Sequence, residues 1–193
     1  KVRLAILGGS FNPVHEGHLS LAKDVHETLG YDRILMIPAN IPPHREMAEG
    51  ATARDRYEML ILATSGYGYI SVSDCELNRG GVSYTIDTLR SLREEYAGVL
   101  EGKIGMIIGQ DLAAGFATWK NADDIAAEFD IILANRPGSG DASFPYRHKR
   151  IDNSPVDASS TGIRDAMRSG CDWSYLVPPA VYRYIVEHKL YER

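Results

Sequence analysis

Short apolar runs that favour β-strands alternate with segments of helical periodicity along almost the whole chain. We expect strands at residues 2–7, 33–37, 69–73, 103–108, 130–134 and 151–156, and helices at 19–29, 52–64, 83–96, 121–128, 160–167 and 180–189. Strands that follow one another through helices are joined by right-handed crossovers and pair in parallel. The sequence therefore predicts an α/β fold: a doubly wound, mainly parallel sheet with helices on both faces and a C-terminal helical part.

Apolar periodicity also predicts which faces of two helices are buried. Residues three or four positions apart lie on the same face of a helix, so a stripe with this spacing marks the side that faces the core. The residues expected on the inward faces of helices 52–64 and 180–189 are Tyr57, Leu60, Ile61, Val181, Ile185 and Val186.

The chain has the size and composition of one ordinary globular domain. Its 193 residues contain no repeat or linker, so we expect a single domain over 1–193. The sequence has no apolar tract long enough to cross a bilayer, and its two cysteines and lack of a secretory signal favour a cytoplasmic location. The net charge of −5 disfavours nucleic acid as a partner, because such binding relies on many basic residues.

The segment from Gly8 to His18 carries the strongest chemical signal. It reads Gly-Gly-Ser-Phe-Asn-Pro-Val-His-Glu-Gly-His and joins the first expected strand to the first expected helix. The paired glycines let the backbone turn sharply and bring its amides close to an anion, and the helix N-terminus adds a favourable dipole. His15 and His18 lie three residues apart, so both rings could donate hydrogen bonds to phosphoryl oxygens. We therefore expect a phosphate group here.

Other interpretations of this segment are weaker. Its glycine spacing matches neither the fingerprint of dinucleotide oxidoreductases nor the P-loop, which needs a Lys-Ser/Thr pair. A purely structural interpretation makes it a solvated turn with two surface histidines. A metal site on His15 and His18 lacks convincing third and fourth ligands. The contiguity of the glycines, Ser10, Asn12-Pro13 and both histidines favours phosphate binding.

A second candidate phosphate site lies at the start of the helix expected at 160–167. The run Ser159-Ser160-Thr161-Gly162-Ile163-Arg164 places hydroxyls and free amides at a helix N-terminus, where such groups bind phosphate, and Arg164 could reach the same anion. Serine and threonine are also common helix N-caps, so this motif alone is ambiguous.

The expected sheet gives several motifs a common location. Doubly wound sheets bind ligands at the carboxyl ends of their strands, where the strand order reverses. Gly8-Gly9 and Gly109-Gln110-Asp111 both follow expected strands, and so does the long loop at 38–50, which is rich in proline. We expect these segments to border one site.

The two phosphate motifs together resemble those of the nucleotidyltransferase superfamily that carries a His-x-Gly-His motif and a Ser-Ser-Thr-x-x-Arg-like motif. Further stretches sharpen the resemblance to bacterial nicotinate-nucleotide adenylyltransferases, in that family's order and spacing. These stretches are Pro42-Pro43-His44-Arg45, Ser83-Tyr84-Thr85, Ile108-Gly109-Gln110-Asp111, Thr118-Trp119 and Asn135-Arg136-Pro137. The resemblance spans nearly the whole chain and implies a Rossmann-like fold.

This resemblance implies a reaction and its small-molecule substrates. AMP would be transferred from ATP to nicotinate mononucleotide, which gives nicotinate adenine dinucleotide, the precursor of NAD, and pyrophosphate. Mg²⁺ would accompany ATP. Neither nucleic acid nor a membrane is expected as a partner. A homo-oligomer is compatible with the sequence, which leaves the oligomeric state open.

The resemblance also implies roles for residues of this chain. The residues implied to be catalytic are His15, His18 and Arg164. Those implied to bind ATP and its phosphates are Gly8, Gly9, Ser10, Phe11, Gly109, Asp111, Ser159, Ser160 and Thr161. Those implied to bind nicotinate mononucleotide are His44, Arg45, Tyr84, Thr85, Trp119 and Arg136, with Trp119 stacked on the pyridine ring. Without the resemblance, Trp119 is as well explained as a core aromatic, Asp111 as a helix cap, and His44 and Arg45 as solvated loop residues.

Three positions depart from the family pattern. Ala158 stands where the family often has Ile, and Gly162 is an uncommon helix former. Asn12 stands where relatives often have Asp, so no role that needs a carboxylate can be assigned to it. Neither Ala158 nor Gly162 removes a phosphate donor.

Two competing functions differ from this one in substrate or in activity. Another nucleotidyltransferase of the superfamily would accept phosphopantetheine, nicotinamide mononucleotide or, with CTP, a glycerol phosphate; Tyr84-Thr85 with Trp119 favours a pyridine ring instead. A catalytically idle nucleotide-binding module would use the same scaffold. The presence of His15, His18 and Arg164 disfavours it.

Overall fold

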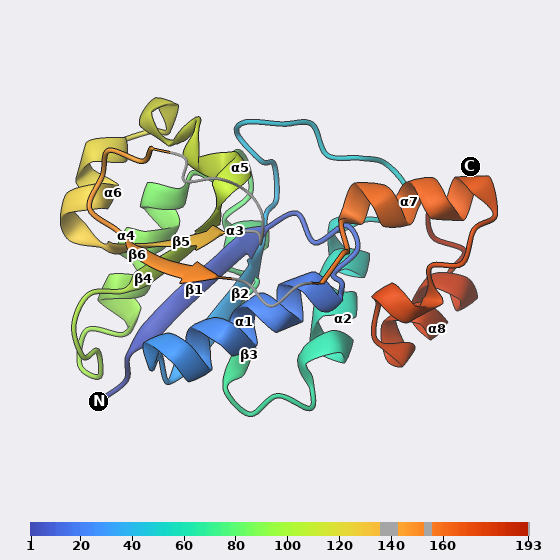
Figure 1. Ribbon diagram of the computed structural model, residues 1–193, viewed down its shortest axis with the longest axis horizontal. Helices are drawn as coiled ribbons and strands as arrows, with labels where there is room; N and C mark the ends of the chain where they lie inside the picture. Colours follow the sequence, from blue (N-terminus) through green and yellow to red (C-terminus); the bar gives the residue numbers. More distant parts are fainter. Residues whose placement is uncertain (136–142, 153–155, 193) are drawn as a thin grey trace.

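The computed structural model describes residues 1–135, 143–152 and 156–192, which form a six-stranded sheet flanked by helices (Figure 1). The strands are β1 (Leu4–Gly9), β2 (Arg33–Pro38), β3 (Ile70–Val72), β4 (Gly105–Gly109), β5 (Asp130–Asn135) and β6 (Lys149–Asp152). They lie in the order β3-β2-β1-β4-β5-β6, and every neighbouring pair is parallel. The predicted doubly wound, Rossmann-like sheet is confirmed.

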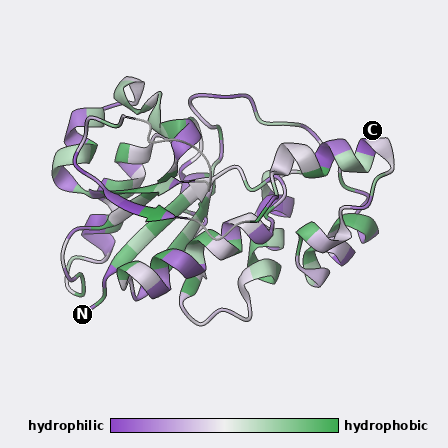
Figure 2. Cartoon of the chain, in the orientation of Figure 1, coloured by the Kyte–Doolittle hydropathy of each residue, from purple (hydrophilic) through white to green (hydrophobic). Residues whose placement is uncertain are grey.

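The centre of the sheet is buried on both faces because β1, β2 and β4 are almost continuously apolar (Figure 2). In β1, Ala5 and Leu7 belong to one hydrophobic core, whereas Leu4 and Ile6 belong to the other. This alternation follows from the two-residue period of a strand. It produces two cores, one on each face of the sheet.

Helices cover each face, as predicted. They are α1 (Glu16–Leu29), α2 (Ala53–Thr64), α3 (Cys75–Arg79), α4 (Thr85–Glu95), α5 (Gln110–Ala113), α6 (Ala122–Glu128), α7 (Ser160–Ser169) and α8 (Pro179–Glu187), with single 3-10 turns η1 (Phe116–Thr118) and η2 (Ser174–Leu176). Buried residues of α1, α2, α7 and α8 join the first core, and those of α4, α5 and α6 join the second. The C-terminal pair α7 and α8 extends away from the sheet on the side of α2 (Figure 1).

Two predicted inward-facing residues are in fact exposed. Ile61 in α2 is 39% exposed and Val186 in α8 is 50% exposed. Neighbouring positions on a helix point about 100° apart, and Ile61 and Val186 lie just beyond the edge of the buried stripes of α2 and α8. In α2 the stripe includes Leu60, as predicted, and also Arg56, which is only 2% exposed, while Tyr57 is half-buried. A charged residue therefore occupies a position that periodicity alone would assign to an apolar one.

The edges of the fold are less regular than its centre. The strand predicted at 151–156 begins two residues earlier, as β6, and residues 153–155 lie outside the described part of the chain. The short elements α3, η1 and η2 were not predicted.

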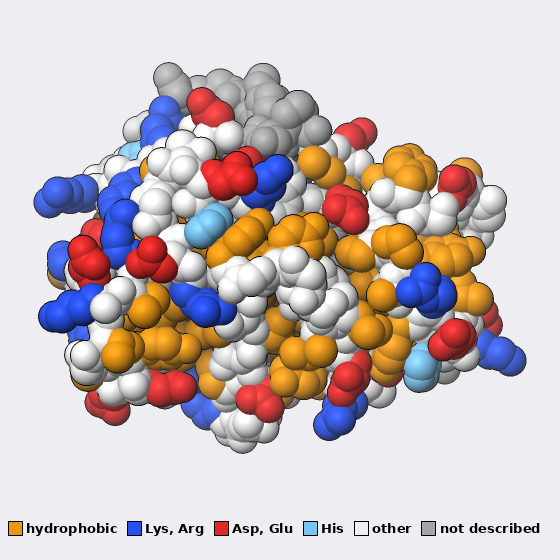
Figure 3. All heavy atoms as spheres, turned by 90° about the horizontal axis from the view of Figure 1, so that it is seen from below, with side chains coloured by type: hydrophobic (Ala, Val, Ile, Leu, Met, Phe, Trp, Pro, Cys, Tyr) orange, Lys and Arg blue, Asp and Glu red, His pale blue; other side chains and the backbone are white. Residues whose placement is uncertain are grey.

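None of the helices in the described ranges combines the length and the apolar character of a membrane span. The face shown in Figure 3 intersperses basic with acidic side chains and gathers no broad basic patch.

Candidate active site

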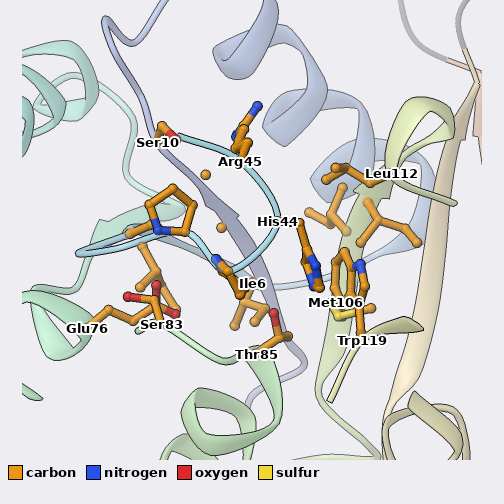
Figure 4. A pocket seen from close by; sticks show the side chains of 18 residues that line it. Ile6, Ser10, His44, Arg45, Glu76, Ser83, Thr85, Met106, Leu112 and Trp119 are labelled. Atoms are coloured by element: carbon orange, nitrogen blue, oxygen red, sulfur yellow. The ribbon is translucent and has the colours of Figure 1, made fainter. Parts of the chain in front are cut away.

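A pocket opens at the carboxyl ends of β1, β2 and β4, where the strand order reverses between β1 and β4 (Figure 4). This is the location that the strand pattern predicts for a ligand. The predicted site residues that line the pocket are Gly8, Gly9, Ser10, His44, Arg45, Thr85 and Trp119. Its volume of about 140 Å³ is close to that of cavities that accept one benzene-sized ring.

Beside the pocket, His15 and His18 form the N-terminal cap of α1. His15 is the N-cap residue, and its Nδ1 accepts a hydrogen bond from the Gly17 amide over 3.0 Å. The Nδ1 of His18 accepts from the backbone amide of His15 over 3.1 Å, which completes a capping box. Because both Nδ1 atoms act as acceptors, the neutral form of each ring carries its proton on Nε2.

The two imidazole rings stack, with their centroids 3.7 Å apart. Burial lowers the pKa of His18 well below its ordinary value, and the neighbouring His15 and Arg45 lower it further. His18 is therefore neutral at pH 7 and offers a hydrogen-bond donor rather than a permanent charge. Gly17 leaves room for this arrangement, since a Cβ at that position would lie 2.9 Å from the ring of His15.

The turn before α1 holds Phe11 in a left-handed conformation, with φ at 48°. Its side chain is 2% exposed, and its ring meets that of His18 edge to face at 4.8 Å. Phe11 therefore supports the histidine from the side of the core. This packing role of the side chain was not indicated by the sequence, and the role predicted for the Phe11 backbone amide stays a prediction.

Three side chains from α2 and α7 donate hydrogen bonds to carbonyl groups of the β1–α1 loop. Arg56 of α2 donates through Nη1 to the carbonyl of Ser10 over 2.8 Å. From α7, Arg164 Nη1 donates to the carbonyl of Asn12 over 2.6 Å, and the Ser160 hydroxyl donates to that of Pro13 over 2.8 Å. The two motifs predicted to bind phosphate are thus neighbours in space. Arg56 was missed because a lone arginine in a helix carries no sequence signal.

The rest of the α7 motif forms the start of that helix. Ser159 is the N-cap residue, and its hydroxyl accepts from the Gly162 amide over 2.9 Å. Thr161 accepts from Arg164 Nη2 over 3.3 Å. Ser159 and Thr161 are exposed, so their hydroxyls remain accessible to a ligand in addition to their structural bonds.

Trp119 and His44 form the aromatic wall of the pocket. Their rings are nearly parallel, at 18°, with their centroids 5.6 Å apart (Figure 4). Trp119 is half-buried and also touches Phe116 at 5.2 Å, so one part of it contacts the core while another lines the pocket. Thr85 starts α4 and lines the same pocket.

Tyr84 does not line the pocket, although the next residue, Thr85, does. The side chain of Tyr84 packs against the second core, and the ammonium of Lys120 lies 4.6 Å from the centre of its ring. Gly109 ends β4 and Asp111 lies exposed in α5, both at the same edge of the sheet. Arg136 lies outside the described residues.

Glu76 lines the pocket although the sequence did not mark it as a site residue. It is 7% exposed and accepts from the Thr88 hydroxyl over 2.7 Å. Burial raises the pKa of its carboxyl group. The nearby Ser83 hydroxyl accepts from the Asn40 amide over 2.9 Å, which joins the long loop to the segment before α4. Glu76 is the sole buried acidic residue in the described part of the chain.

Comparisons with known proteins show what the chain is similar to. A family model described as Cytidylyltransferase-like matches residues 6–166. A protein from Treponema pallidum (strain Nichols) is 41% identical over 98% of this chain and 99% of its own length. One from Synechococcus sp. (strain JA-3-3Ab) is 39% identical over 98% of this chain and 94% of its own length. Both are named "Probable nicotinate-nucleotide adenylyltransferase".

A solved structure shares the fold. Plasmodium falciparum nicotinic acid mononucleotide adenylyltransferase, complexed with NaAD, matches with a TM-score of 0.81 over 99% of this chain and 98% of its own. The two sequences are 17% identical, so this likeness concerns the fold alone.

Proposed function

Since the chain belongs to the nicotinate-nucleotide adenylyltransferase family, we propose that it transfers AMP from ATP to nicotinate mononucleotide and so forms nicotinate adenine dinucleotide and pyrophosphate. The observation that carries this proposal is the meeting of two phosphate motifs beside a pocket with an aromatic wall. The Ser160 hydroxyl of one motif bonds the Pro13 carbonyl of the other over 2.8 Å. One site can thus receive both the phosphates and a ring.

The β1–α1 loop receives the phosphates that react. The glycine turn brings the amides of Gly9, Ser10 and Phe11 to the carboxyl end of β1, and the N-terminus of α1 adds its dipole. His15 and His18 supply Nε2–H donors, because their Nδ1 atoms are engaged by backbone amides. Neutral donors are suited to stabilise charge that develops during transfer.

The start of α7 holds the pyrophosphate that leaves. Its free amides and the hydroxyls of Ser159, Ser160 and Thr161 face an anion from a helix N-terminus. Arg164 adds a positive charge that is half-buried and hence only partly screened by water. Its Nε atom is buried and has no hydrogen-bond partner, so a phosphate oxygen would satisfy it.

The pocket receives the pyridine ring of the acceptor. Trp119 offers an aromatic face, with His44 parallel to it, and Thr85 borders the same space. Arg45, which lines the pocket next to His44, provides a charge for the carboxylate or the phosphate of the mononucleotide. We assign Gly109 and Asp111, at the carboxyl end of β4, to the adenosine side, while the roles implied for Tyr84 and Arg136 stay predictions.

The transfer needs no covalent help from the protein. The phosphate of nicotinate mononucleotide is an anionic nucleophile, and pyrophosphate is a good leaving group, so attack on the α-phosphorus of ATP proceeds in line. The new P–O bond joins the two nucleotides while the bond to pyrophosphate breaks. Alignment of the reactants and neutralisation of charge supply the catalysis. A stable adenylylated protein in a single turnover would contradict this mechanism.

We propose that Mg²⁺ enters with ATP. Mg²⁺ at nucleotide sites keeps several waters and is held largely by the substrate's own phosphates. The described residues include no cluster of three or more His, Cys, Asp or Glu side chains that could hold a metal, so this proposal relies on the phosphates of ATP as ligands. When bound, the ion would neutralise charge on the phosphates as they separate.

Pyrophosphate release from ATP in the presence of Mg²⁺ tests this function. Nicotinate mononucleotide, nicotinamide mononucleotide and phosphopantetheine are offered in parallel, and the mass of each product is measured. We expect the fastest release with nicotinate mononucleotide, together with the mass of nicotinate adenine dinucleotide. Faster release with another acceptor would change the substrate but keep the chemistry. No release with any acceptor would support an idle binding module and overturn the proposal.

A further inference from the structure

The end of the chain reaches the catalytic loop through Tyr191. This residue follows α8 and adopts a left-handed conformation, with φ at 61°. Its side chain is 7% exposed, and its hydroxyl donates to Oδ1 of Asn12 over 2.6 Å. The two residues are 179 positions apart in the sequence. Asn12 lies between the glycine turn and His15, so this bond acts on the loop that carries the catalytic histidine pair.

The amide group of Asn12 joins three segments. Its Oδ1 accepts from Tyr191, and its Nδ2 donates to the carbonyl of Ala48 in the long loop after β2 over 2.8 Å. The same long loop binds Tyr191 directly, because the Tyr191 amide donates to the carbonyl of Gly50 over 3.1 Å. Gly50 has φ at 118°, and a Cβ there would lie 2.7 Å from the Tyr191 ring. The position of Tyr191 is therefore fixed by backbone as well as by side chain.

Two arginines lower the pKa of the Tyr191 phenol, against the larger effect of burial. Arg56 and Arg164 interact electrostatically with it, and each donates to a carbonyl of the β1–α1 loop. Burial raises the pKa of the Tyr191 phenol far above its ordinary value, so the group remains a donor. Because Asn12 Oδ1 is an acceptor without charge, it needs such a donor to be satisfied in a buried position.

We propose that Tyr191 is a positioning residue for adenylyl transfer, whose hydroxyl holds Asn12 and thereby keeps the loop with His15 and His18 in its reactive geometry. This inference rests on the proposed function. The hydroxyl acts on the turn that carries the phosphate-binding groups, and neither Tyr191 nor Asn12 lines the pocket with Trp119. Its loss should therefore slow the chemical step without weakening the binding of the pyridine ring.

Tyr191→Phe removes the hydroxyl and keeps the ring. Tyr184→Phe is a matched control, because Tyr184 also lies near the C-terminus and its hydroxyl donates to Asp55 of α2 over 2.8 Å, without touching the catalytic loop. We expect Tyr191→Phe to lower kcat about tenfold and to change KM for nicotinate mononucleotide less than about twofold. The control should leave both constants within about twofold of the wild type, while thermal unfolding shows how much stability each variant loses.

A double-mutant cycle with Asn12→Ala tests the connection itself. If Tyr191 acts through Asn12, the double variant should be about as slow as Asn12→Ala alone. If the loss of kcat in the double variant equals the product of the two single losses, Tyr191 acts independently of Asn12 and the inference is overturned. If Asn12→Ala does not fold, the comparison of the two tyrosine variants decides alone.

The rate of the wild type distinguishes a failure of the proposed function from a failure of this inference alone. A wild type that transfers no adenylate would overturn the proposed function together with the inference built on it. An active wild type, with Tyr191→Phe no slower than Tyr184→Phe, would overturn the inference and leave the function intact. A Tyr191→Phe variant that unfolds at a lower temperature but keeps the wild-type kcat would also overturn the inference and leave the function intact.

Discussion

The imidazole rings of His15 and His18 lie face to face, with centroids 3.7 Å apart and planes 29° from parallel. The Nδ1 atom of each ring accepts a hydrogen bond from a backbone amide, and these bonds cap α1. The same bonds leave Nε2 as the protonated nitrogen of each neutral ring. The same two hydrogen bonds therefore cap the helix and orient the two donors that we propose to be catalytic.

Loss of the His18 imidazole should slow the chemical step. We expect His18→Ala to lower kcat by about 100-fold and to change KM for ATP only a few fold, because a donor to developing charge matters most in the transition state. His18→Gln is the matched control for folding, since glutamine at the third helical position can still complete the capping box. Steady-state kinetics of both variants measures this. An unchanged kcat with a raised KM would contradict the role of His18.

Acid should destabilise the protein through His18. The folded state lowers the pKa of His18 below its ordinary value of 6.5, so the unfolded chain takes up a proton first as the pH falls. The free energy of unfolding should be insensitive to this group above about pH 7, and should fall by up to about 1.4 kcal/mol per pH unit below pH 6.5. Denaturant titrations of the wild type and His18→Gln from pH 7.5 to 5.5 test this. Identical slopes in the two proteins would rule out His18 as the cause.

A single methyl group at Gly17 should disturb the histidine pair. The Cβ of Gly17→Ala would lie 2.9 Å from the His15 ring, which must shift and so weaken its bond to the amide of residue 17. We expect kcat to fall about tenfold or more, as small displacements of catalytic groups are costly. Gly98→Ala provides the control, because a Cβ there meets no atom within 4 Å. Equal kcat in the two variants would show that the ring position does not matter.

Elements that depend on local patterns could be predicted from the sequence. The run before Gly109 is apolar at every position that β4 buries, and Gly30 ends α1 with φ at 72°, as a glycine after a helical stripe indicates. The two motifs predicted to bind phosphate could be identified in the sequence because each is contiguous. Their placement at one edge of the sheet follows from the alternation of strands and helices.

Contacts between distant segments could not be predicted in this way. Arg56 bonds the carbonyl of Ser10, which is 46 residues away, and no pattern in α2 marks this arginine as buried. Gly162 is unfavourable in a helix by its propensity alone, but a Cβ there would lie 2.9 Å from the hydroxyl of Ser159, which caps α7. Propensity describes one residue at a time, whereas these roles depend on a partner that only the folded chain brings near.

Trp119 should determine how tightly the pyridine ring is held. Its ring lies parallel to that of His44 on the pocket wall, while its other contact is with Phe116. We expect Trp119→Ala to raise KM for nicotinate mononucleotide about tenfold, the equivalent of about 1.4 kcal/mol of lost stacking and burial, with KM for ATP nearly unchanged.

The matched variant Trp119→Phe separates stacking from simple packing. Phenylalanine keeps an aromatic face, so its KM for nicotinate mononucleotide should lie between those of the wild type and Trp119→Ala. If Trp119 served mainly to support Phe116 in the core, both substrates would lose affinity together and the unfolding temperature would fall in step. A KM effect confined to the mononucleotide, in a variant that unfolds near the wild-type temperature, places the pyridine ring against this indole, because only one of the two substrates carries that ring.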